Sequence, residues 1–94
     1  MIRGTTPTLT FTLPFEPTGI VKDVSITFLQ GEGTILEKKL VDCEIDGVDM
    51  RLRLTREDTM KFSPCKWIKI RVDMVCMDDN VITADLIYDM CCDV

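Results

Sequence analysis

The sequence predicts an all-β protein, a small antiparallel β-sandwich of six or seven strands with one short helical turn. Apolar and polar residues alternate through most of the chain, and turn residues separate the alternating runs at intervals of roughly 8 to 14 residues. No stretch has the spacing of a long amphipathic helix. Because an amphipathic sheet needs a second apolar layer, and no helix is expected to supply it, that layer must be another sheet. A partly open barrel is the alternative.

The first predicted strand covers residues 6–13. Leu9, Phe11 and Leu13 alternate along it with Thr8, Thr10 and Thr12. Threonine favours strands, so we expect an edge strand or a half-exposed one. Pro14, Pro17 and Gly19 end it, since proline cannot donate a ladder hydrogen bond and glycine allows a turn.

A first hairpin is predicted around the turn at residues 30–33, which contains Gly31 and Gly33. The strand before the turn places Val24, Ile26 and Phe28 on one face. The run after it, residues 34–41, does not alternate cleanly. A β-bulge would reconcile its phase, although residues 37–39 would also suit a helical turn.

A second hairpin turns at Asp46 and Gly47, after which Val48, Met50, Leu52 and Leu54 alternate with charged residues. Next, Thr55 is a candidate N-cap with acidic residues in the following turn. We therefore expect one short helical turn, ended by Pro64.

The last hairpin joins a long strand that begins at Trp67 to a strand over residues 81–88, through a turn at residues 78–80. Ile82, Ala84 and Leu86 are expected to point inward from the final strand. Depending on the loop register, Asp85 lies opposite Arg71 or Asp73.

Composition limits the function classes. The chain has 94 residues, enough for one domain over residues 1–94, and its 11 Lys and Arg against 16 Asp and Glu give a net charge of −5. That charge disfavours nucleic acid and anionic membranes. No histidine is present, which removes the most common general base and metal ligand. The N-terminus lacks the apolar stretch of a secretory signal peptide, so we expect no secretion by that route.

The number of cysteines is odd and their spacing is irregular. The five are Cys43, Cys65, Cys76, Cys91 and Cys92. Zinc sites usually have ligands in close pairs that repeat along the chain, and the cysteines of this chain do not form such pairs. We expect reduced thiols that act as small hydrophobes, with no metal and no cofactor.

Carboxylates near turns are interpreted as structural. Asp58 is expected to cap the helical turn. Asp78 and Asp79 lack the ligand spacing of a calcium loop. No residue is predicted to be catalytic, so we expect no enzymatic activity.

One exposed sheet face is predicted to carry Trp67, Lys69 and Arg71, and a position of Arg51 and Arg53 near it is a further hypothesis. Aromatic and basic side chains on a sheet can stack on bases, and they are also common in protein interfaces. The negative net charge favours a protein contact over nucleic acid, and an ordinary solvated face is the remaining interpretation.

The segment LTREDTMKF, residues 54–62, resembles the turn before the sixth strand of immunoglobulin-like domains, with Asp58 and Phe62 in the acidic and aromatic positions. Phe62 lacks the hydroxyl of that corner, and Pro64 stands where the second disulfide cysteine would be. The resemblance implies an immunoglobulin-like sandwich and no function.

The opening MIRGTTPTLTFTLPF resembles small proteins encoded by phages and prophages of Firmicutes. The resemblance implies a virion- or tail-associated protein, in the host cytoplasm or the assembled virion, similar to the immunoglobulin-like N-terminal modules of baseplate proteins. It supplies no catalytic or ligand residues, and Cys91 and Cys92 depart from it.

The leading hypothesis is a non-enzymatic structural module that works by protein contact in virion or tail assembly, binding phage structural subunits or associating with itself by edge strands. Its candidate contact residues are Thr8, Thr10, Thr12, Trp67, Lys69 and Arg71. The alternative is a small module that binds carbohydrate or single-stranded nucleic acid through Trp67, Lys69 and Arg71.

Overall fold

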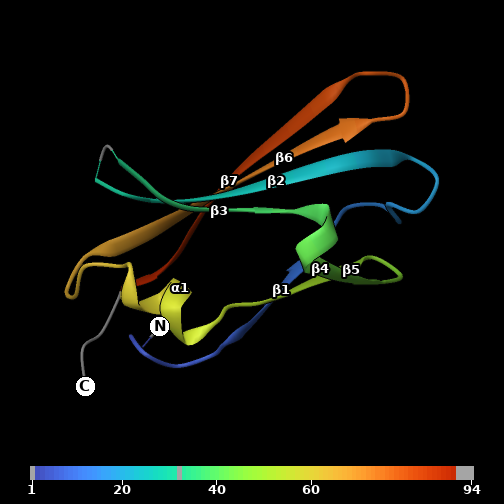
Figure 1. Cartoon of the computed structure of the whole chain (residues 1–94). Helices are drawn as coiled ribbons and strands as arrows, with labels where there is room; N and C mark the ends of the chain where they lie inside the picture. The colour runs from blue at the N-terminus through green and yellow to red at the C-terminus, as the bar shows by residue number, and fades with distance from the viewer. Residues whose placement is uncertain (1, 32, 91–94) are drawn as a thin grey trace.

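A computed structural model describes residues 2–31 and 33–90 and contains two antiparallel sheets packed face to face (Figure 1). The strands are β1 (Thr8–Thr12), β2 (Val21–Gln30), β3 (Gly33–Lys39), β4 (Cys43–Asp46), β5 (Asp49–Arg53), β6 (Trp67–Cys76) and β7 (Val81–Met90). Two short helices, η1 (Leu40–Asp42) and α1 (Arg56–Met60), connect them. The predicted β-sandwich is confirmed. Within the described residues, neither helix is long and apolar enough to cross a membrane.

One sheet has the strand order β1-β5-β4 and the other β3-β2-β6-β7. These orders match strands B-E-D and C′-C-F-G of an immunoglobulin-type sandwich. Helix α1 then lies between strands E and F, at the corner that the segment at residues 54–62 resembles. In residues 2–31 and 33–90 no strand occupies the place of strand A, which pairs with strand B in that fold. The edge of β1 is therefore open.

Alternation along the strands builds the core between the sheets, because successive side chains point to opposite faces. The predicted inward positions of β1, β2, β5 and β6 are buried, whereas Val48, predicted to share the face of Met50, is 41% exposed and lies in the turn before β5. The buried positions include Leu9, Phe11, Val24, Ile26, Phe28, Met50, Leu52, Ile68, Ile70, Val72 and Met74. Phe62, just after α1, adds its ring to this core, with its centroid 5.8 Å from that of Phe28.

The predicted bulge lies in β3. Phe28 pairs with Leu36 and Leu29 pairs with Thr34, which leaves Ile35 as the extra residue. The strand continues through Lys39, so the helical turn considered for residues 37–39 is wrong; the turn comes immediately afterwards, in η1. Through η1 the chain crosses from the four-stranded sheet to the three-stranded sheet.

Helix α1 has the predicted capping arrangement. The backbone N–H of Asp58 donates to Oγ1 of Thr55 at 3.1 Å, and the backbone N–H of Thr55 donates to Oδ2 of Asp58 at 2.9 Å. The helix ends at Met60, before Pro64, so the prediction that the proline ends it is wrong.

Ile82 points inward as predicted, but it is not buried. Its neighbour across the strands, Met74, is 2% exposed, whereas Ile82 is 40% exposed and Ala84 is half-buried. The reason is that β7 is an edge strand, and no described strand of the three-stranded sheet covers it. The side chain of Leu86 lies outside the described part, as do Cys91 and Cys92.

Candidate functional site

The six candidate contact residues divide between two opposite faces. Thr8, Thr10 and Thr12 are exposed on the outer face of β1, and Trp67, Lys69 and Arg71 are exposed on the outer face of the four-stranded sheet. Arg51 and Arg53 do not lie near Trp67. Because β5 pairs with β1, these arginines flank the threonines instead, with Arg51 opposite Thr10 and Arg53 opposite Thr8.

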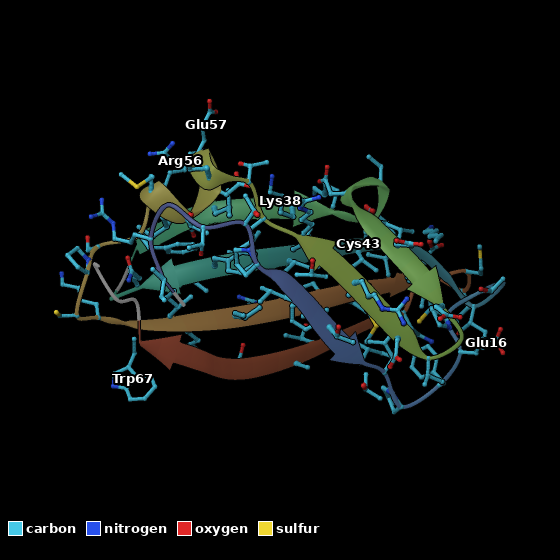
Figure 2. The ribbon with its side chains drawn as sticks, turned by 90° about the horizontal axis from the view of Figure 1, so that it is seen from below. Glu16, Lys38, Cys43, Arg56, Glu57 and Trp67 are labelled. Atoms are coloured by element: carbon cyan, nitrogen blue, oxygen red, sulfur yellow. The ribbon has the colours of Figure 1, made fainter. Side chains whose placement is uncertain are left out.

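Trp67 begins β6 and is 58% exposed, projecting away from the sheet (Figure 2). It lines a shallow apolar pocket of about 450 Å³ together with Leu29, Gly31 and Lys69. The neighbouring cations have carboxylate partners: Lys69 Nζ lies 3.7 Å from Asp85, and Arg71 Nε lies 3.4 Å from Asp73. Asp85 is opposite Arg71, the first of the two predicted registers. These ion pairs neutralise the basic strip.

The edge of β1 carries free backbone groups at regular spacing. Leu13 N–H donates to the Val48 carbonyl at 2.8 Å, and Leu54 N–H donates to the Pro7 carbonyl at 2.9 Å. In an antiparallel pair, every second residue bonds the neighbouring strand. The odd-numbered residues of β1 therefore bond β5. The N–H and C=O groups of Thr8, Thr10 and Thr12 point to the open edge.

An apolar groove runs beside this edge, between the two sheets. It has a volume of about 210 Å³ and is referred to below as the edge groove. Its lining residues are Thr10, Phe11, Thr12, Leu13, Pro14, Val72, Met74 and Ala84. Ile82 continues the apolar surface along β7, since it lies two residues before Ala84 on the same face.

The other three edge strands carry devices that discourage pairing with another chain. β3 has a bulge and the charged residues 37–39, and Lys38 points inward, because it pairs with the buried Ile26. β4 has only four residues, two of them acidic. β7 carries Asp85 in an ion pair with Lys69. β1, with the sequence TLTFT, has no charge, no proline and no register shift.

Lys38 and Asp58 join β3 to α1. Lys38 Nζ lies 3.1 Å from Asp58 Oδ2, and both side chains are largely buried. Burial alone would raise the pKa of Asp58, but the hydrogen bonds from Thr55 and Lys38 outweigh it and hold the pKa below its ordinary value of 3.8. The carboxylate is a structural group.

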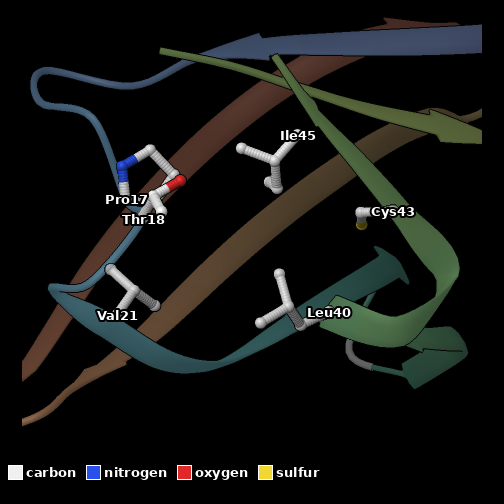
Figure 3. Close-up of a pocket in the computed structure, with 6 residues that line it drawn as sticks. All are labelled: Pro17, Thr18, Val21, Leu40, Cys43 and Ile45. Carbon is white, nitrogen blue, oxygen red and sulfur yellow. The ribbon is translucent and has the colours of Figure 1, made fainter. Parts of the chain in front are cut away.

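A third pocket, of about 260 Å³, lies beside the crossover (Figure 3). It is lined by Pro17, Thr18, Val21, Leu40, Cys43 and Ile45. Burial, together with the negative charge of Asp42, raises the pKa of the Cys43 thiol to about 11. A thiol that stays protonated is a poor nucleophile and a poor metal ligand. Among the side chains of residues 2–31 and 33–85, no three His, Cys, Asp or Glu are grouped so that they could hold a metal ion.

The sequence analysis did not predict the structural roles of two buried polar residues, Thr59 and Gln30. Thr59 is fully buried, and its hydroxyl donates to the Thr5 carbonyl at 2.9 Å and accepts from the Gly4 N–H at 3.0 Å. Gln30 accepts from the Ser63 N–H at 2.7 Å and so fixes the loop before β6. No local pattern marks these residues, because their partners are distant in sequence. Both are structural, and Thr59 holds residues 4 and 5 against α1, away from the β1 edge.

In comparisons with known protein families, with characterised proteins and with solved structures, none matches this chain.

Proposed function

We propose that this protein is a non-enzymatic protein-interaction module that binds its partner by strand addition at β1. One observation carries the proposal: β1 alone among the four described edges is uncharged and unbroken while presenting free backbone groups at Thr8, Thr10 and Thr12. Main-chain hydrogen bonds to an added strand supply affinity, and pockets for alternate side chains supply specificity. The edge groove is such a pocket.

Virion or tail assembly is the process we propose for this contact. The resemblance of residues 1–15 to phage-encoded proteins supports it. A small sandwich with one unprotected edge also suits an assembly role, because an edge left open in a free protein risks aggregation unless a partner covers it.

Incorporation into phage particles tests both parts of the proposal. In Thr10→Pro the ring removes an N–H that points outward and leaves the bonds to β5 in place, so the fold is expected to survive. Thr10→Val is the matched control, because it keeps the backbone donor and the side-chain volume. Particles purified after induction of the native host should contain the wild-type chain and Thr10→Val on an immunoblot, and should contain at least about tenfold less Thr10→Pro.

Absence of the wild-type chain from the particles would show that the assembly role is wrong. Equal incorporation of Thr10→Pro, with an unchanged circular dichroism spectrum, would show that β1 is not the contact.

A carbohydrate- or nucleic-acid-binding role is the second candidate, supported by exposed Trp67 and its pocket. The ion pairs of Lys69 and Arg71 weigh against the nucleic-acid form. Retention of the protein on single-stranded oligonucleotides at low salt, lost in Trp67→Ala, would favour it, since affinity for phosphates falls steeply with ionic strength.

A further inference from the structure

The sandwich is one strand short on the side formed by β1 and β7. In the matching immunoglobulin-type order, strand A pairs with strand B and lies over strand G, here β1 and β7. Nothing in the described residues fills that place. Two consequences of the vacancy are visible independently: the free backbone groups of Thr8, Thr10 and Thr12, and the 40% exposure of Ile82 on the inner face of β7.

The shape of this vacancy excludes the edge of a sandwich whose second sheet would lie on the β7 side. Met74 of β6 and Ala84 of β7 line the edge groove together with β1, so the place beside β1 has the inner face of β7 beneath it. A second sandwich that paired its own edge strand with β1 would bring its second sheet, about 10 Å below, into the space that β7 holds. Two copies of this chain joined through their β1 strands meet the same obstacle. A single extended segment has no second layer and fits.

The lining of the vacancy defines the chemistry of that segment. Side chains that point inward from it meet Ala84, Ile82 and Met74, so they must be apolar at alternate positions. Pro14 cannot donate a hydrogen bond at the open edge, so pairing ends at Thr12 and spans about the five residues of β1.

Carboxylates lie at one end of the vacancy. Asp49 accepts a hydrogen bond from Thr12 Oγ1 at 3.0 Å, and Asp78 lines the hollow that contains Ile82. The whole chain also has a net charge of −5. An antiparallel segment begins at the Thr12 end of β1, so basic residues before its first paired residue would be complementary.

We infer that the partner supplies one flexible, extended segment with apolar residues at alternate positions and basic residues at its N-terminal end, which pairs antiparallel to β1 and covers Ile82 and Ala84. This inference rests on the proposed function and specifies its partner.

A synthetic peptide tests the inference. The probe has two N-terminal lysines followed by alternating threonine and valine over the length of β1. One control has the lysines at the C-terminus, and another has the same composition with the valines grouped together. In ¹⁵N and methyl NMR titrations, the probe should shift the amides of Thr8, Thr10 and Thr12 and the methyl signals of Ile82. It should bind at least about threefold more tightly than either control.

Two variants make the test specific. Thr10→Pro should abolish the shifts, and Ile82→Ser, which leaves the β1 backbone intact, should weaken binding about tenfold because less apolar surface is covered. Equal binding of the grouped-valine peptide, or shifts confined to β3 or β4, would overturn the inference. Self-association through β1 detected by sedimentation would overturn the exclusion of a sandwich edge. The proposed function is tested separately: if incorporation into particles still depends on Thr10, strand addition at β1 holds even when one of these results overturns the inference about the partner.

Discussion

The two long sides of this sandwich differ in how they are closed. On the closed side, β3, η1 and β4 follow one another in the chain, so the crossover at Leu40–Asp42 covers the seam between the sheets. Leu40, Cys43 and Ile45 pack against the core there. On the open side, β1 and β7 lie far apart in sequence, and no described segment crosses between them. A connection that changes sheets seals a sandwich, and a side without one keeps an apolar seam that a partner can use.

Removing the carboxylate of Asp58 should give the largest loss of stability on the closed side. In Asp58→Ala the cap of α1 is lost and Lys38 stays largely buried without its partner. We expect the free energy of unfolding in urea to fall by about 3 kcal/mol. Glu57→Ala is the matched control, since Glu57 is an exposed acid in the same turn (Figure 2), and it should change stability by less than about 0.5 kcal/mol. Similar losses in both variants would contradict the role given to the ion pair.

The alkylation rate of the Cys43 thiol should show how well the crossover buries the closed side. Its pKa of about 11, against an ordinary 9.0, makes the thiolate fraction at neutral pH about 100-fold smaller. Alkylation of Cys43 by iodoacetamide, followed by mass spectrometry of the peptide, should be slower by about that factor in the native protein than in denaturant. A native rate equal to the denatured rate would mean that the crossover does not shield this strand.

Acid should weaken the closed side through Asp58. Its pKa is lower in the folded protein than in the unfolded chain, so its contribution to stability is complete above the unfolded value of 3.8 and is lost as pH falls through the folded value. Wild-type protein should lose more stability than Asp58→Asn between pH 5 and the acid limit of the urea titrations. Parallel pH profiles for the two proteins would rule out this linkage.

On the open side, Ile82→Ser should have the smallest effect. Because the side chain is 40% exposed, we expect the free energy of unfolding to change by less than about 1 kcal/mol. Leu36→Ala on β3, a buried position, is the comparison and should cost about 2–3 kcal/mol. A loss in Ile82→Ser as large as in Leu36→Ala would show that the open side is already filled in the free protein.

Local patterns predicted the elements well. Alternation identified the strands, Asp46 and Gly47 marked a hairpin, and the capping residues Thr55 and Asp58 placed α1. These signals are local because side-chain direction, turn conformation and capping each depend on a few neighbouring residues.

Pairing between distant strands was not predictable in the same way. The expectation that Arg51 lies near Trp67 failed because β5 pairs with β1. Ile82 points inward as expected, but it is exposed because no described strand covers β7. Alternation shows which face of a strand is apolar and carries no information about what lies opposite. The uncharged sequence TLTFT indicates an unprotected edge. The edge groove could not be predicted, because its lining residues come together only through the order of the strands in the two sheets.

The pairing of β1 with β5 also affects the order of folding. The other strand pairs of the two sheets include three hairpins, β2–β3, β4–β5 and β6–β7, that close over short turns, whereas β1 must wait for residues 49–53 before it gains any ladder bond. Contacts distant in sequence form late, because more chain entropy is lost when they close. The pairing of β2 with β6 is equally distant in sequence, but each of those strands also belongs to a hairpin, whereas β5 is the only described partner of β1. We expect β1 to exchange its amide hydrogens before β2 and β6, so the strand that offers the free edge is also the one held least firmly in its own sheet.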